Sequence, residues 1–204
     1  MAHGDLTEYP ELLTQLDAWF REGLDQAGPS VVPCSAGCSA CCNGPFDISP
    51  ADAALVARGV RALSPGTRAG VLLRAEAQLT RYAEFAPFWG PPWDVAALGE
   101  EAFDQLSEAL ADLPCPALDS QGICSIYEYR PATCRLMGLA AVTPDGDVLE
   151  NACPIQSGFP GYAALPPTPF DLLRFELQAE EVDRTVAAKG GFSTTVAGAL
   201  LLRV

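Results

Sequence analysis

The chain has 204 residues, 49% of them hydrophobic and 19% charged, which is enough to bury the core of a globular domain and excludes a wholly disordered protein. Twelve Lys and Arg against 26 Asp and Glu give a formal net charge of -14. A surface this acidic repels a phosphate backbone, so nucleic-acid binding is not expected. The longest apolar stretch, near residues 196–202, is too short to cross a bilayer, and no membrane-spanning segment is expected.

The amino terminus is polar and acidic, where a secretory signal would carry positive charge followed by an apolar stretch. We therefore expect a cytoplasmic protein, in which thiols stay reduced unless a metal binds them. The only histidine is His3, so neither an imidazole base nor a Ser/His/Asp triad is expected. The partner is expected to be an unidentified protein or small molecule, and neither a nucleic acid nor a membrane.

Helical periodicity dominates the first half of the chain. Apolar residues recur at helical spacing over residues 10–26. Ser49-Pro50 and Ser64-Pro65 each place an N-cap before a first-turn proline and predict two further helices, the second ending at about Phe85. The proline-rich segment 86–93 breaks that helix, and another helix is expected over residues 100–113.

Turn signals appear in the second half. Asp-Ser-Gln-Gly at 119–122 predicts a tight turn between two short strands, and Pro-Asp-Gly-Asp at 144–147 predicts a second such turn. Pro131 can open a single helical turn. A cap at residues 168–171 predicts a long helix to about Ala188.

The predicted fold is mainly α, an irregular helical bundle with one or two small β-hairpins organised around a cysteine-rich metal centre. We expect a single domain over residues 1–204, with a cysteine core at 34–153 and a carboxyl-terminal helical region at 165–204.

Cysteines carry the strongest chemical signal in the sequence. Four of the eight fall in Cys34-x3-Cys38-x2-Cys41-Cys42, between small residues that let several thiolates converge on one centre. The other four are widely spaced within the predicted hairpin region, where the fold could gather them: Cys115, Cys124, Cys134 and Cys153.

Two other interpretations of the cysteines remain open. Buried cysteines can act as small hydrophobes, but four within a polar, glycine-containing loop do not resemble core packing. An even count would also suit disulfides, but the expected reducing compartment opposes them, and the adjacent pair Cys41-Cys42 is a poor disulfide former.

A thiolate-only site suits either structural zinc or an iron-sulfur cluster. The spacing favours a 4Fe-4S cluster, with zinc as the alternative, because a cubane accommodates C-x3-C-x2-C with a distant fourth ligand. The expected shared site is Cys34, Cys38 and Cys41 with one of the later cysteines. Radical S-adenosylmethionine enzymes also use this spacing, but the chain lacks the strand-helix alternation of their barrel.

The cysteine block, followed by Cys124-Ser-Ile-Tyr-Glu-Tyr-Arg-Pro-Ala-Thr-Cys134-Arg135, resembles the YkgJ-type cysteine-cluster family of zinc- or iron-chelating proteins. The resemblance covers about residues 34–153. It implies a cytoplasmic bacterial protein with a cysteine-bound metal or iron-sulfur centre. Longer relatives include flagellin lysine methylases, but this chain shows no glycine-rich methyl-donor loop, so that activity is not expected here.

Two arginines and three aromatic residues outside the cysteines are further candidates for the site. Arg130 and Arg135 bracket Cys134 and could offset thiolate charge, although Arg130 could equally be a solvated residue or pair with Glu128. A possible pocket or docking surface is formed by three aromatic residues, with packing over the core as the alternative: Phe88, Trp89 and Trp93.

The sequence thus predicts a cytosolic metalloprotein that binds an iron-sulfur cluster or zinc through convergent thiolates. Whether it is a redox or modifying enzyme of unknown substrate is left open, because that depends on whether sulfur fills every coordination position. The alternative is a non-catalytic, zinc-stabilised interaction or maturation factor.

Overall fold

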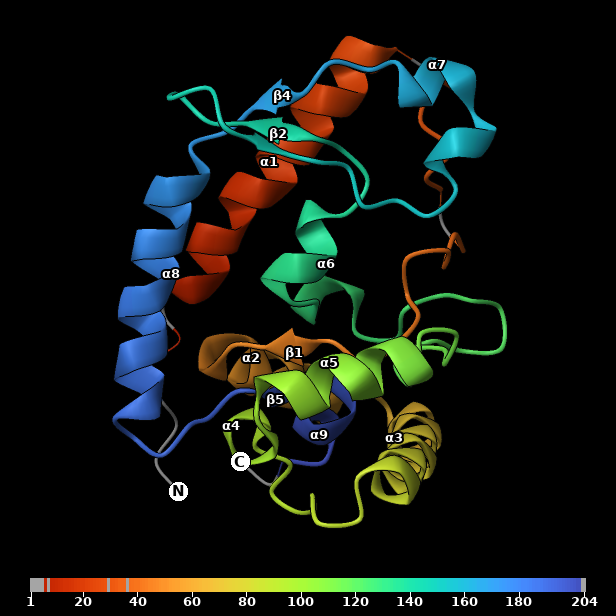
Figure 1. The fold of residues 1–204 in the computed structure, drawn as a ribbon, viewed down its shortest axis with the longest axis vertical. Helices are drawn as coiled ribbons and strands as arrows, with labels where there is room; N and C mark the ends of the chain where they lie inside the picture. The colour runs from red at the N-terminus through yellow and green to blue at the C-terminus, as the bar shows by residue number, and fades with distance from the viewer. Residues whose placement is uncertain (1–5, 7, 29, 36, 203–204) are drawn as a thin grey trace.

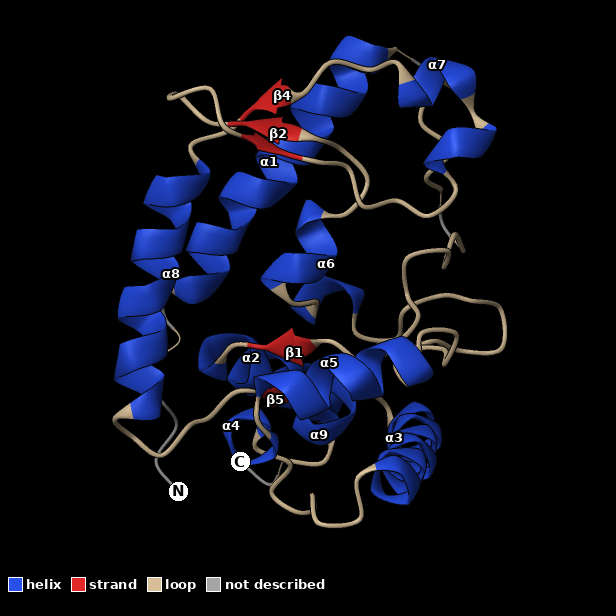
Figure 2. Ribbon diagram, in the orientation of Figure 1, coloured by secondary structure: helices blue, strands red, loops and turns tan. Residues whose placement is uncertain are grey.

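The computed structural model describes residues 6, 8–28, 30–35 and 37–202, so His3 lies outside the described residues. The fold is mainly α-helical with short strands in small sheets, as the sequence predicted (Figure 2). Helices gather in two groups above and below the short helix α6, Ala132–Leu136 (Figure 1). The described part of the chain contains no helix with the length and apolar character needed to cross a bilayer.

The upper group in Figure 1 contains long helices, a one-turn helix and a small sheet. Helix α1 (Tyr9–Ala27) buries Leu13, Leu16 and Trp19 on one face, the periodicity seen in the sequence, and lies beside α8. The indole Nε1 of Trp19 donates to the carbonyl of Thr168 at 3.2 Å and joins α1 to the sheet. The other elements of this group are α8 (Leu172–Ala187), β2 (Ala141–Val142), β3 (Val148–Leu149), β4 (Thr168–Pro169) and the one-turn helix α7 (Pro160–Ala163).

The sheet has the strand order β3-β2-β4. Strands β2 and β3 pair antiparallel across the turn predicted at 144–147, which confirms that hairpin. Strand β4 pairs parallel with β2, so Thr168 and Pro169 extend the sheet instead of starting the helix predicted there. Asp171 is the N-cap of α8 and accepts from the backbone N–H of Arg174 at 3.1 Å.

The lower group packs helices around a hydrophobic core. Ser49 and Ser64 cap α2 and α3 through their hydroxyls at the predicted positions, and each helix begins with the expected proline. Its elements are α2 (Pro50–Ala62), α3 (Pro65–Phe85), α4 (Val95–Leu98), α5 (Glu100–Ala109), α9 (Val196–Leu200), and the antiparallel pair β1 (Asp47–Ile48) and β5 (Thr194–Thr195).

Helix α5 ends four residues before the predicted boundary at residue 113. Its last apolar residues form tight turns, and the carbonyl of Leu113 accepts from Gly44 at 2.8 Å. The chain leaves the helix early because this segment bonds to the cysteine loop.

The first predicted hairpin is only partly correct. Its turn forms, because the Asp119 carboxylate accepts from the backbone N–H groups of Gln121 and Ile123 at 2.8 and 2.9 Å. The flanking strands reduce to one isolated bridge between Leu118 and Cys124, followed by a 3-10 turn at Tyr127–Tyr129. Prolines at 114 and 116 lack the N–H groups that a longer ladder would use.

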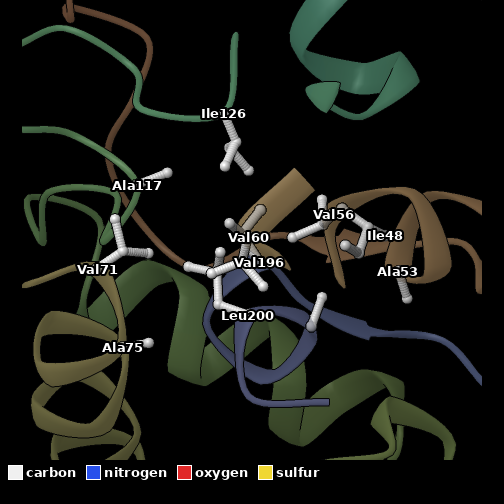
Figure 3. Close-up of a cluster of buried hydrophobic side chains, with 11 residues drawn as sticks. Ile48, Ala53, Val56, Val60, Val71, Ala75, Ala117, Ile126, Val196 and Leu200 are labelled. Carbon is white, nitrogen blue, oxygen red and sulfur yellow. The ribbon is translucent and has the colours of Figure 1, made fainter. Parts of the chain in front are cut away.

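The main core cluster connects the helices to the cysteine-bearing segments. Val56 and Val60 of α2, Val71 of α3 and Leu200 of α9 meet there, and all are buried. Ala117 and Ile126, which flank the Asp119 turn, point into the same cluster (Figure 3). Burial of these two side chains fixes the Cys115–Cys124 segment against the helical shell.

Candidate metal centre

The first four cysteines lie in a loop of short turns. The backbone N–H of Cys38 donates to the carbonyl of Ser35, and that of Cys42 donates to the carbonyl of Ser39, both at 2.9 Å. This loop runs beside the 115–125 segment (Figure 1). The two segments approach so closely that a Cβ atom on Gly122 would lie 3.1 Å from the carbonyl oxygen of Gly37.

Main-chain bonds hold Cys42 next to Cys115. The N–H of Cys115 donates to the carbonyl of Cys42 at 2.8 Å, and Asn43 and Pro114 form an isolated antiparallel bridge. The fold thus brings together two cysteines that are 73 positions apart in the sequence.

A second meeting point lies around Gly138, whose φ is +108°. A Cβ atom on this glycine would lie 3.5 Å from the Sγ of Cys34. The Gly138 carbonyl accepts from Asn151 Nδ2 at 3.1 Å and from the Tyr162 hydroxyl at 2.5 Å. The Oδ1 of Asn151 in turn accepts from the backbone N–H of Cys153 at 2.9 Å. This network brings Cys153 to the vicinity of Cys34.

Electrostatics follow the same grouping. Partial burial, together with the nearby charges of Cys38, Cys153 and Cys41, raises the pKa of the Cys34 thiol to about 11. Burial also raises the pKa of Tyr162, which hydrogen-bonds to Cys153. A metal that binds these sulfurs must displace their protons, so its affinity increases with pH.

The adjacent thiols Cys41 and Cys42 share a proton. The Cys42 thiol donates to the Cys41 thiolate, which lowers the pKa of Cys41 below its usual range. The same hydrogen bond raises the pKa of Cys42, as do burial and the charges of Cys41, Cys115 and Cys134. Cys41 is therefore the more readily deprotonated thiol of the pair, which suits a metal ligand.

The remaining cysteines lie in a drier setting. Burial raises the pKa of Cys115 to about 11 and raises that of Cys124. Burial raises the pKa of Cys134 as well, and the charges of Cys115 and Cys124 add to this effect. Arg74 opposes the shift at Cys115, and Arg130 opposes it at Cys124.

The donor set fits a soft metal in its chemistry. All eight cysteines are free thiols, Cys34 exposed and the others half-buried. Within residues 6, 8–28, 30–35 and 37–202, no three His, Cys, Asp or Glu side chains are arranged as ligands of one ion. A metal bound here thus requires the thiols to rotate toward it, starting from loops that already lie together.

The two arginines that bracket Cys134 both pair with an acidic residue that the sequence did not suggest. Arg130 and Arg135 form ion pairs with Asp17 of α1, the Arg130 Nη2 to Asp17 Oδ1 distance being 2.8 Å. Arg130 also lies over the ring of Tyr127, 4.0 Å from its centroid. Arg130 pairs with Asp17, and among the described residues no ion pair joins it to Glu128.

The aromatic residues of the proline-rich segment differ in exposure. Trp89 is 3% exposed and packs between Tyr82, Trp93 and Phe103. Its indole N–H donates to the carbonyl of Asp94 at 2.8 Å, so Trp89 belongs to the core and is not available for docking. Trp93 packs against that core, whereas Phe88 is 75% exposed.

Sequence reasoning missed several residues that surround the thiols. Gly138, Asn151 and Tyr162 position Cys34 and Cys153, and Arg74 donates to the Pro116 carbonyl at 3.0 Å beside Cys115. Gly138, four residues after Cys134, could have been found from the sequence, because glycine is the residue expected at a bend with positive φ.

The helical shell and the gathered free thiols define a small cysteine-cluster protein. Residues 33–154 match the family model CxxCxxCC, described as "Putative zinc- or iron-chelating domain". The chain therefore belongs to this family, which confirms the resemblance seen in the cysteine motif. In this chain the first gap of the motif holds three residues, one more than the family's name indicates. No curated protein and no solved structure matches the chain.

Proposed function

We propose that this zinc- or iron-chelating protein is a cytoplasmic metalloprotein that binds an iron-sulfur cluster through Cys34, Cys38, Cys41 and Cys153. The cluster type favoured is 4Fe-4S, which takes four protein thiolates. When bound, such a cluster supplies electron transfer or a structural cross-link.

The observation that carries this proposal is the network at Gly138. It ties Cys153 through Asn151 to Gly138, which lies beside Cys34 of the first cysteine loop, although 111 positions separate Cys153 from Cys42. The charges of Cys38, Cys41 and Cys153 all act on Cys34. These contacts support Cys153, of the four later cysteines, as the fourth ligand.

The residues around this group suit a metal-thiolate centre. Asn151 and Tyr162 form the fixed hydrogen bonds that orient the backbone near Cys34 and Cys153. Cys34 is exposed, so the centre is accessible from the surface for loading and for electron exchange.

Anaerobic purification followed by metal and acid-labile sulfide analysis tests the proposal. A brown protein containing iron and sulfide in equal amounts is expected. The Cys38→Ser variant should lose this cluster, while Ser35→Ala in the same loop should keep it because only the Ser35 carbonyl bonds to Cys38. A colourless protein with stoichiometric zinc would instead support the zinc-stabilised interaction factor, and a metal-free protein would overturn both.

A further inference from the structure

Four cysteines remain outside the proposed cluster, and the fold gathers them separately. Cys42 and Cys115 are joined directly, since the Cys115 N–H donates to the Cys42 carbonyl at 2.8 Å. The N–H of Gly44 donates to Leu113 at 2.8 Å and extends this contact along both segments. The main-chain segments at Cys42 and at Cys115 are thus held side by side before any metal binds.

Cys124 lies across the Asp119 turn from Cys115. The Leu118 N–H donates to the Cys115 carbonyl at 3.1 Å, and Leu118 forms the isolated bridge with Cys124. Cys115 and Cys124 both pack against the main core cluster. The two cysteines therefore lie on the inner side of this segment, toward the core.

Helix α6 supplies Cys134 to the same place. The guanidinium of Arg135 binds the carbonyls of Arg130 and Glu128 at 3.2 and 3.0 Å, which ties α6 to the turn that follows Cys124. Burial raises the pKa of Cys134, and the charges of Cys115, Cys124, Asp52 and Cys41 raise it as well. The charges of Cys41, Cys115 and Cys134 act in the same direction on Cys42.

Positive charge is available beside this group. The Nε of Arg74 is fixed 3.0 Å from the Pro116 carbonyl, next to Cys115, and its charge favours the Cys115 thiolate. Arg130 acts in the same way on Cys124. Four thiolates around a divalent ion or a cluster leave net negative charge, which these two guanidinium groups offset.

The structure assigns Cys42, Cys115, Cys124 and Cys134 to a second thiolate centre, separate from the one formed by Cys34, Cys38, Cys41 and Cys153, that takes a zinc ion or a second iron-sulfur cluster. This inference goes beyond the proposed function, because that function needs one centre only. The adjacent residues Cys41 and Cys42 belong to different centres, and the peptide bond between them joins the two.

Metal content of the full chain and of two double variants tests this assignment. The metal-free protein is loaded anaerobically with zinc, which either group of four thiolates can bind, and analysed for bound zinc. Cys34→Ser/Cys153→Ser and Cys115→Ser/Cys124→Ser should each keep about half of the zinc of the unsubstituted chain. The two half-loaded variants should also differ in zinc release rate, because their centres differ in exposure.

Other outcomes overturn the inference in distinguishable ways. If both double variants lose all metal, the eight thiols form one shared centre. If the Cys34/Cys153 variant loses all metal and the other keeps all of it, the proposed function survives and the second centre fails. If the Cys115/Cys124 variant does not fold, chelator competition on the unsubstituted chain decides, with two release phases expected and one phase contradicting the inference.

Discussion

Asp17 of α1 pairs with Arg135 of α6, the residue next to Cys134, and so couples the first helix to the cysteine core. The Arg135 side chain is 6% exposed and that of Asp17 is 31% exposed. Arg130 binds the other oxygen of the same carboxylate at 2.8 Å. One carboxylate thus pairs with two guanidinium groups, one on either side of Cys134, and leaves net positive charge there.

Asp17→Asn should therefore lower the free energy of unfolding by about 1–3 kcal/mol, because a buried guanidinium loses its charged partner. The partial exposure of Asp17 and the carbonyl partners of Arg135 keep the loss below that of a fully buried pair. The matched control is Glu84→Gln, which breaks the exposed Arg81–Glu84 pair and should cost at most about 0.5 kcal/mol. Urea unfolding measures both, and equal losses would show that the Asp17 pairs contribute no more than a surface pair.

Asp52 should make stability depend on pH. Burial raises its pKa from 3.8 to about 6, although Tyr9 and the Ala132 N–H donate to its carboxylate. The folded state therefore holds the proton more tightly than the unfolded state. The stability contribution of Asp52 is greatest below its unfolded pKa and is lost as the pH rises through the interval from 3.8 to about 6.

Asp52→Asn should remove this component of the pH dependence. The comparison is the difference in unfolding free energy between the variant and the unsubstituted chain at each pH, so that thiol and metal effects common to both cancel. That difference should change steadily across the interval and level off above it. A constant difference at every pH would mean that the folded pKa of Asp52 is not raised.

Much of the fold follows from local sequence. The hydroxyls of Ser49 and Ser64 each accept a backbone N–H three residues on, so the starts of α2 and α3 could be read directly from Ser-Pro. The ends of α5 and the start of α8 could not be read in this way. Leu113 and Thr168 lie outside the helices predicted to contain them. The Leu113 carbonyl accepts from Gly44 and the Thr168 N–H donates to Ala140, and both partners are distant in the sequence.

The candidate site likewise has a part that follows from local sequence and a part that depends on tertiary contacts. The first cysteine loop is local, and its spacing alone marks it. The partners of that loop are set by tertiary contacts, with Cys115 on the Cys42 carbonyl and Cys153 held by Asn151 near Gly138. Sequence spacing contains no information on these contacts, so the choice of the fourth ligand could not be made from it.

Cys41 should be the most reactive thiol of the metal-free protein. Because the Cys42 thiol donates to it and lowers its pKa, iodoacetamide should alkylate Cys41 first near neutral pH, with a rate whose midpoint in pH lies below that of an ordinary thiol. Cys42→Ala removes the donor and should shift this midpoint upward. Cys38→Ala is the control, since Cys38 does not donate to Cys41. Peptide mapping by mass spectrometry measures the rates, and an unchanged midpoint in Cys42→Ala would contradict the shared proton.

Gly138→Ala should weaken the centre formed by Cys34, Cys38, Cys41 and Cys153. A Cβ atom at this position would lie 3.1 Å from the Phe20 ring and 3.5 Å from the Cys34 sulfur, and the φ of +108° is unfavourable for any residue with a side chain. Gly146→Ala is a matched control, because Gly146 has a φ of +94° but no heavy atom within 4 Å of its Cβ position.

Both variants should lose about 1–2 kcal/mol of stability from backbone strain. Only Gly138→Ala should lose metal, because only there does the new methyl group crowd a neighbour, the Phe20 ring, while also contacting the Cys34 sulfur. Metal analysis of anaerobically loaded protein and urea unfolding of the same samples separate the two effects. Equal metal content in the two variants would mean that Gly138 is needed only for the backbone turn. The position of Cys34 would then not depend on the absence of a side chain at residue 138.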